Sequence, residues 1–333
     1  MKPDKLFLIL LLIMSTGLSV YGQENVEDEV PSYQTMYDDP YDIRNLYIQF
    51  QPLYGDISAL NITGGFGIEG AYYHKSLFDV QLAFRTSYGK RFDMNRHAAI
   101  KNDTYDNKFP VHFNLEFGGT YHVRDLMKES SSHVLLYSKH LKGTEWASTV
   151  ARSAEINGKV RTIIGARLGG MFYSSTLDVS SALEAQNKEL FSNGIPVVET
   201  DMYTNVQAFV IYVGGSYSMI RNFAVEFSER YDPSGDDILF TPFLDFMFAP
   251  SVNIKDFNVG TEVISTAPLD KLAMGFRGGL NIKFNRKLSW GTTVETGIRP
   301  GVKKRGFFIT FKMSFPIYAK KIEQKAQEED STN

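Results

Sequence analysis

The sequence contains no cysteine. Disulfides, thiolate nucleophiles and cysteine-ligated metal centres are therefore excluded, and so is the lipid-bearing cysteine of a bacterial lipoprotein. An excess of one charge is also lacking, because 35 Lys and Arg stand against 38 Asp and Glu, which predicts no affinity for nucleic acid. Beyond the first 22 residues, no apolar run approaches the roughly 20 residues that a membrane-spanning helix needs.

Aromatic residues are plentiful, at 14% of the chain with 25 Phe and 18 Tyr, and they recur at alternate positions. In the stretch that begins at Phe109, Val111, Phe113, Leu115 and Phe117 alternate with His112, Asn114 and Glu116. Such a period of two predicts strands with one apolar and one polar face. Fourteen segments carry it: 46–51, 60–69, 78–85, 109–122, 131–141, 145–155, 160–173, 204–218, 222–231, 238–249, 254–264, 271–284, 287–298 and 306–318.

The connections between these segments differ in length. Residues 74–76, 220–221, 250–253 and 285–286 form short connections, and Asn157-Gly158 is a typical two-residue hairpin signal. Connections 89–108, 176–203 and 299–305 are long and polar. Short turns on one rim and long loops on the other are typical of outer-membrane barrels. We therefore predict an all-β fold, a single-chain antiparallel transmembrane β-barrel of about 14 strands, or 12 if the pair 131–141 and 145–155 lies outside the wall.

The two ends of the chain predict an exported protein with solvent-exposed termini. Lys2 and Lys5 precede an apolar run from Leu6 to Met14, which predicts a cleavable signal peptide over residues 1–22; a membrane anchor is the alternative. We predict an acidic periplasmic leader over 23–44, the barrel over 45–318 and a charged periplasmic tail over 319–333. These features place the protein in the bacterial outer membrane, where its first partner is outer-membrane lipid.

Several predicted strands share a Gly-Gly pair near an aromatic or polar residue, in "FGGTYH", "LGGMFY", "VGGSYS" and "RGGLNI". With the signal sequence and the absence of cysteine, this style resembles the uncharacterised outer-membrane β-barrel proteins of Bacteroidota. The resemblance covers the whole mature chain and implies a barrel of the outer membrane.

The apolar stripes can face either lipid or a soluble core. A soluble sandwich or lipocalin-like barrel is the alternative, but the polar stripes are rich in Gly, Thr, Asn and Gln, which suits a narrow lumen. If the apolar stripes face lipid, the predicted lumen residues are Glu69, Arg85, His112, Glu116, Arg161, Arg167, Glu226, Arg230, Asp245, Arg277, Lys283, Glu295 and Lys312. These charges either pair across the lumen or form a polar constriction that sorts solutes.

No catalytic, cofactor or metal site is predicted. The Asp-x-His element of omptin-like barrel proteases is absent from the sequence. A short helix is predicted over 180–191 in the longest loop, capped by Ser180 or Ser181 and ended by Asn193-Gly194. Two non-enzymatic functions follow. The first is a channel or transporter for a small solute or lipid-like ligand. The second is a structural or accessory barrel of an envelope complex, with other envelope proteins as partners.

Overall fold

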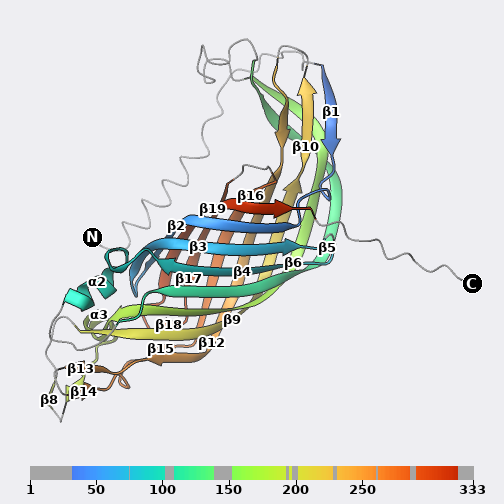
Figure 1. Ribbon diagram of the computed structural model, residues 1–333. Helices are drawn as coiled ribbons and strands as arrows, with labels where there is room; N and C mark the ends of the chain where they lie inside the picture. The colour runs from blue at the N-terminus through green and yellow to red at the C-terminus, as the bar shows by residue number, and fades with distance from the viewer. Residues whose placement is uncertain are drawn as a thin grey trace, which may run out of the picture. The chain divides into compact units, whose positions relative to one another are not determined.

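Ten antiparallel strands form a closed barrel in this computed structural model, which describes residues 32–74, 76–101, 109–138, 152–192, 195–196, 202–227, 231–259, 262–285 and 290–321 (Figure 1). The predicted signal peptide and most of the tail lie outside these residues. Around the barrel the strands are β2 (Leu46–Ser58), β3 (Ile62–Tyr73), β4 (Phe78–Ser87), β5 (Phe113–Leu136), β6 (Arg152–Asp178), β9 (Tyr203–Arg221), β12 (Ile238–Ile254), β16 (Met274–Phe284), β17 (Gly291–Ile298) and β19 (Phe307–Lys320), which pairs with β2.

The all-β antiparallel barrel is confirmed, but its wall has ten strands and the predicted count of 14 is not confirmed. The predicted strands 131–141 and 145–155 are continuations of β5 and β6 beyond the wall. Segment 222–231 forms β10 (Phe223–Phe227), which leaves the wall after Asn222. Segment 254–264 is the end of β12 followed by a small hairpin of β13 (Phe257–Val259) and β14 (Glu262–Ile264).

Two segments that were predicted as turns lie inside strands. Asn157 and Gly158 lie within β6, where they pair with Ser131 and Ser130 of β5. A Cβ on Gly158 would lie 3.2 Å from the ring of Phe223, so close packing explains this glycine. The sequence 250–253 lies in β12 at a shift of register against β9, beyond the last pair with β16. Pro250 is tolerated at this position, because an irregular strand edge does not need a backbone N–H donor.

The barrel has a first rim, where β2 begins and β19 ends, and a second rim at the opposite strand ends. β3 ends and β4 begins at the first rim, where β16 also ends and β17 begins. The second rim carries the short connection 59–61 and, of the longer connections, the described residues 88–101, 109–112, 179–192, 195–196, 202, 255–259, 262–273 and 299–306. These contain η1 (Lys90–Phe92), α2 (Met94–Lys101), α3 (Val179–Gln186), β7 (Phe191–Ser192), β8 (Ile195–Pro196), β15 (Lys271–Leu272) and β18 (Gly301–Val302).

Helix α3 is shorter than the predicted helix 180–191. Asp178 caps it by accepting a hydrogen bond from the Ser181 N–H at 3.1 Å, and Asn187 ends it in the left-handed conformation with φ of 55°. Because the helix stops there, Leu190 lies in the buried apolar cluster while Phe191 is exposed.

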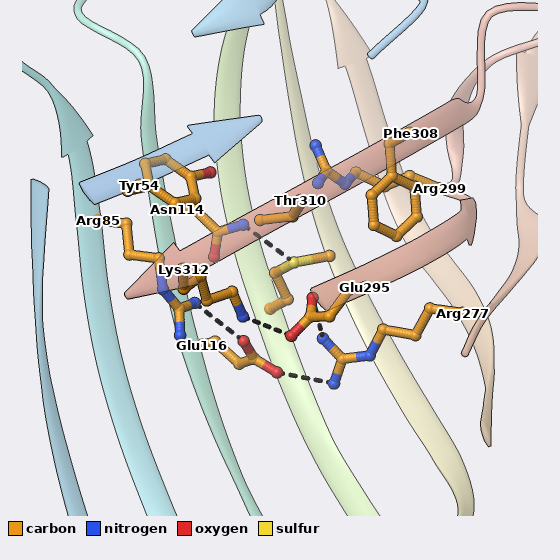
Figure 2. Close-up of a pocket in the computed structure, with 11 residues that line it drawn as sticks. Tyr54, Arg85, Asn114, Glu116, Arg277, Glu295, Arg299, Phe308, Thr310 and Lys312 are labelled. Atoms are coloured by element: carbon orange, nitrogen blue, oxygen red, sulfur yellow. Dashed lines mark hydrogen bonds and ion pairs between the residues drawn. The ribbon is translucent and has the colours of Figure 1, made fainter. Parts of the chain in front are cut away.

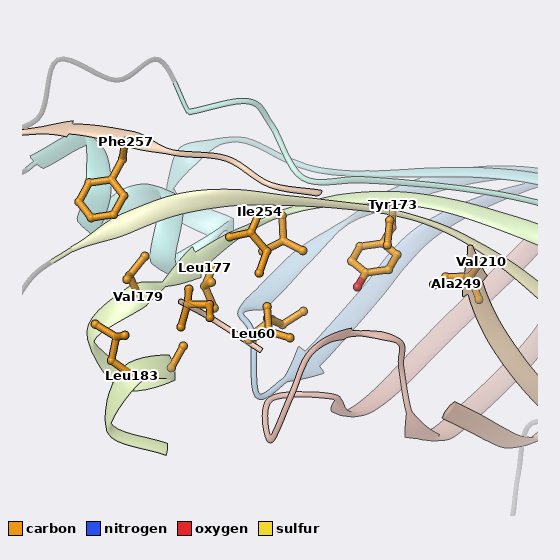
Figure 3. Close-up of a cluster of buried hydrophobic side chains, with 14 of the residues drawn as sticks. Leu60, Tyr173, Leu177, Val179, Leu183, Val210, Ala249, Ile254 and Phe257 are labelled. Atoms are coloured by element: carbon orange, nitrogen blue, oxygen red, sulfur yellow. The ribbon is translucent and has the colours of Figure 1, made fainter. Parts of the chain in front are cut away.

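Toward the second rim, the barrel interior contains an apolar cluster on the side formed by β6, β9 and β12. Side chains of β6, β9, β12, α3 and the adjoining loops form one buried cluster, shown in part in Figure 3: Leu60, Tyr173, Leu177, Val179, Leu183, Val206, Val210, Tyr212, Met247, Ile254, Phe257, Ile264, Leu269 and Val302 among them. Inward positions of β9 are therefore apolar, which explains the ambiguous alternation of the sequence around Phe209. A smaller apolar cluster of Ile43, Ile163, Ile220 and Leu239 lies toward the first rim.

Beyond the first rim, β5 and β6 continue together with β1 (Tyr33–Asp38), β10 and β11 (Ser234–Asp236). We call this part the arm: residues 124–136, 152–159 and the sheet of order β1, β10, β11. Its buried core comprises Val134, Leu136, Ala154, Ile156, Phe223, Val225, Phe227 and Tyr231. The second half of the predicted leader 23–44 thus includes a strand. Residues 124–136 alone extend about 40 Å along the strand, at about 3.3 Å for each residue.

No helix in the described ranges has both the length and the apolar character needed to cross a bilayer.

Candidate functional site: an ionic layer inside the barrel

Buried charged side chains cross the middle of the barrel, between the two apolar clusters. The wall strands supply them from inward positions, since neighbouring residues of a strand point to opposite faces. Ten of the predicted lumen residues are buried on these strands: Glu69, Arg85, Glu116, Arg161, Arg167, Asp245, Arg277, Lys283, Glu295 and Lys312. His112, directly before β5, is buried as well.

Two predicted lumen residues do not belong to this group. Glu226 lies on β10, outside the barrel, and is exposed. The prediction for Glu226 is wrong because it assumed that segment 222–231 was a wall strand. Arg230 lies outside the described residues.

Arg277 is the centre of the ionic layer, with 1% of its surface exposed. Its guanidinium lies 2.7 Å from Glu116 Oε1 and 3.6 Å from Glu295 Oε2 (Figure 2). It also lies 2.9 Å from Asp245 Oδ2. The ring of Tyr212 lies below it, with the guanidinium carbon 4.3 Å from the ring centroid. Four strands, β16, β5, β12 and β17, are thereby joined through one side chain.

Each carboxylate around Arg277 also binds a second cation. Asp245 accepts from Arg167 Nε at 2.9 Å, Glu116 lies 3.1 Å from Arg85, and Glu295 accepts from Lys312. A buried carboxylate is strongly destabilising unless it is paired, and a shared arrangement gives every group more than one partner.

A second chain of contacts extends the layer toward β2 and β3. Arg85 donates from Nε to Gln51 Oε1 at 2.9 Å and lies 3.5 Å from Glu69. Glu69 in turn accepts from Lys283 Nζ at 2.8 Å and from Gln51 Nε2 at 2.9 Å. The ionic layer therefore reaches the carboxylates of both β3 and β5 through Arg85.

A further buried ion pair lies toward the second rim. It includes Arg299, which was not among the predicted lumen residues. Arg299 donates to Asp56 Oδ2 at 2.8 Å, and Tyr54 donates to the same carboxylate at 3.2 Å. The Tyr54 hydroxyl also lies 3.3 Å from His112 Nε2. Arg299 follows β17 directly, so the inward phase of that strand, continued by two residues beyond Gly297, was the signal that identifies it.

Asp125 was also missing from the predicted lumen residues. It accepts from Arg161 Nε at 2.9 Å and from the Tyr41 hydroxyl at 3.2 Å, so it ties β5 to β6 and to the segment before β2. The guanidinium of Arg161 also lies 4.2 Å from the centroid of the Tyr41 ring. Alternation did not predict Asp125, because the register of β5 shifts between His122 and Arg124 and its two faces exchange there.

Little space is left between these side chains. The cavity lined by Arg85, Glu116, Arg277, Glu295 and Lys312 has a volume of about 10 Å³ (Figure 2). A water molecule needs roughly 10–15 Å³ measured in this way. A second cavity, toward the first rim and lined in part by Tyr73, His122, Arg161, Arg167 and Lys283, has about 40 Å³. The first volume suits one water molecule at most, and the second suits a few.

The described residues contain no group of three His, Asp or Glu side chains placed to hold a metal ion. A His-x-Ser triplet, a spacing found in barrel acyl hydrolases, occurs at His74-Lys75-Ser76. His74 and Ser76 lie in the turn between β3 and β4, where the Ser76 backbone N–H donates to His74 Nδ1 at 3.4 Å. The ring therefore contacts the backbone of the turn, and the chemistry of the layer itself is charge pairing.

Comparison of the chain with protein-family models and with characterised proteins gave no match.

Proposed function

We propose that this chain is a bacterial outer-membrane β-barrel whose lumen is closed by its own side chains, and that it serves as a structural or accessory barrel of the envelope. The ionic layer around Arg277 is the observation that carries the proposal. The transport function expected from the sequence needs a path through this layer.

The outer face of the barrel supports the membrane part of the proposal. Outward positions of the wall are apolar and exposed, with 46% of Phe117, 63% of Leu168 and 66% of Phe246 accessible. The same face continues around the barrel in Ile48, Ile68, Leu82, Phe84, Leu115, Ile211, Val213, Leu244, Phe276 and Phe311. Exposed apolar patches of soluble monomers rarely exceed a few hundred Å², so an apolar band around a barrel suits lipid.

The length of the band agrees with a bilayer. On β5 the outward residues run from Phe113 to Val123, and ten residues of a strand tilted by about 45° rise roughly 25 Å. Beyond Val123 come Arg124 and, further along, the exposed Lys128 and Glu129. We place the boundary of the membrane at this point, with the arm in the periplasm and the second-rim loops outside the cell.

The closed lumen favours the accessory interpretation over the channel. An ion that entered the layer would have to displace Arg277 from three carboxylates, and separating a buried ion pair costs about 3–5 kcal/mol. Toward the second rim, the apolar cluster around Tyr173 and Leu177 and the ion pair of Arg299 with Asp56 occupy further parts of the lumen. The proposal includes no enzymatic activity. It retains export by the signal peptide 1–22, outer-membrane lipid as a partner, and the resemblance to Bacteroidota barrels.

A conductance measurement tests the proposal. Purified protein is inserted into planar bilayers and into liposomes, and insertion is verified by protection of the wall strands from protease. We expect no current steps and no swelling of liposomes in small sugars, because the ionic layer fills the lumen. An open general porin assayed in parallel is the positive control. Steady current steps from inserted wild-type protein would contradict the closed lumen and restore the channel interpretation.

A further inference from the structure

Strand β1 of the arm is bound along one edge only. It pairs with β10, from Tyr33 opposite Phe227 to Asp38 opposite Phe223, and the described residues provide no strand partner for its other edge. All residues from Tyr33 to Tyr37 are exposed, including 56% of Met36 and 49% of Tyr37. An exposed apolar edge is a template for a further strand, so proteins usually shield such edges.

Strand β6 has a free edge as well. From Val160 onward it pairs with both β5 and β9, but among the described strands residues 152–159 pair with β5 alone. The two free edges begin at the same point, because the Lys159 N–H donates to the Asp38 carboxylate at 2.9 Å. We call these two unpaired edges, residues 33–37 of β1 and 152–158 of β6, the slot.

The remaining neighbours in the arm are joined to each other. Beside β5, the chain around β11 forms an antiparallel bridge between Ser138 and Tyr231, and the Asp232 N–H donates to the Tyr137 carbonyl at 2.9 Å. The Ser234 hydroxyl donates to the Leu135 carbonyl at 3.2 Å. The strands thus surround the arm core in the order β1, β10, β11, β5, β6. Among the described strands, the edges of β1 and β6 that form the slot lack a neighbour.

The side chains beside the slot define the pattern of an added strand. Ala154 and Ile156 of β6 and Phe227 of β10 face the buried core of the arm, and the ring of Tyr33 lies edge-on to Phe227 with centroids 6.0 Å apart. Ser153, Glu155 and Asn157 point to the opposite, exposed side. An added strand would place alternate apolar residues against the core and polar residues outward.

The charge around the slot favours a cationic strand. Glu155 of β6 and Glu226 of β10 are exposed on the outer side, and Asp38 marks the closed end. Arg152 and Lys159 are the cations of the same part of β6. The sequence that leads into β1 adds four acids, Glu24, Glu27, Asp28 and Glu29. A segment with alternating apolar and basic residues would be complementary to this acidic border.

We propose that the slot receives an extended, cationic segment of a partner protein, which adds a strand between β1 and β6. This mode of recognition combines backbone hydrogen bonds for affinity with alternate side chains for specificity. That the partner is periplasmic rests on the proposed membrane placement, whereas the slot itself does not depend on it.

Binding of synthetic peptides to the protein in detergent tests the slot apart from membrane function. The probe is a fluorescent heptapeptide of alternating Lys and Val, and the controls alternate Glu and Val or contain Pro at the central position. We expect saturable binding of the Lys-Val peptide at low ionic strength, at least about tenfold tighter than either control. Hydrogen exchange should slow at 33–37 and 153–157 in the complex, because added strand hydrogen bonds protect these amides.

A pair of charge variants supplies the second measurement. Glu155→Lys combined with Glu226→Lys should weaken binding about tenfold or more. Glu184→Lys combined with Glu189→Lys makes the same charge change on exposed residues of the second rim and should leave affinity within about twofold. The proposal is overturned by lack of saturable binding, by equal binding of the Glu-Val peptide, or by protection elsewhere. It is also overturned if a dimer protects 33–37 without peptide, since a second copy then occupies the edge. A conducting barrel would leave these results unaffected.

Discussion

Replacement of Arg277 measures directly whether the barrel interior is filled. The Arg277→Met variant keeps most of the side-chain volume and removes the charge. Three carboxylates then lose their shared partner, and two of them, on Glu116 and Asp245, lie 2.7 and 2.9 Å from the guanidinium in wild type. Removing one partner of a buried ion pair costs about 3–5 kcal/mol, because the remaining charge stays buried.

A water-filled lumen predicts a smaller loss in the free energy of unfolding for Arg277→Met. Exposed ion pairs contribute about 0–1 kcal/mol, since water and salt screen them. The matched control is Lys188→Met at the second rim, where the ammonium lies 2.6 Å from Asp270 but the two side chains remain 31% and 42% exposed. We expect the control to change the free energy of unfolding by less than about 1 kcal/mol.

The assay is urea-induced unfolding of each variant in lipid vesicles, followed by tryptophan fluorescence. A double variant, Arg277→Met with Glu116→Gln, should recover part of the loss, because one of the carboxylates left unpaired is then neutral. If Arg277→Met costs no more than the Lys188 control, the layer is solvated and our argument for a closed lumen fails.

The remaining predictions concern the membrane boundary and the second-rim loops. Leu168→Arg, on the outward face of β6, should destabilise the inserted barrel by about 2–4 kcal/mol, whereas Met127→Arg, equally apolar but on the arm, should cost less than about 1 kcal/mol. Equal cost of the two in vesicle unfolding would refute the boundary at Val123. The hydrogen bond from Lys188 lowers the pKa of Asp270, so the contact is complete above the ordinary carboxyl value of about 3.9 and is lost as pH falls through the lowered pKa. The protection factors of amides 183–188, which correct for the intrinsic pH dependence of exchange, should therefore fall as the pH is lowered from 5 to about 2 in wild type, whereas Asp270→Asn should show the lower protection already at pH 5. An Asn variant with wild-type protection at both pH values would contradict this.

The ionic layer shows which features strand alternation predicts and which it does not. Alternation assigns a face to each residue of a strand, and the structure places Glu69, Arg85 and Arg277 in the interior. It does not indicate partners, because Arg277 meets Glu116 across the barrel, from a strand more than 150 residues away in sequence. Arg299 was missed because it lies one residue beyond a strand end, where the alternation is no longer visible.

The strand count failed for a related physical reason. A strand that leaves the wall keeps its alternation when it covers another apolar core, as β10 does with Phe223, Val225 and Phe227 in the arm. Sequence therefore records that one face of segment 222–231 is buried, but not against which neighbours. The same ambiguity placed Glu226 in the lumen, although it is exposed on the arm.

The sequence by itself determined the all-β class, the antiparallel hairpin order and the alternation of most wall strands, because these follow from local periodicity and turn length. The tertiary structure decided the closure at ten strands, the continuation of β5 and β6 into the arm, and the filling of the lumen around Arg277. Closure and filling depend on hydrogen bonds and ion pairs between strands distant in the chain, and no local pattern specifies those.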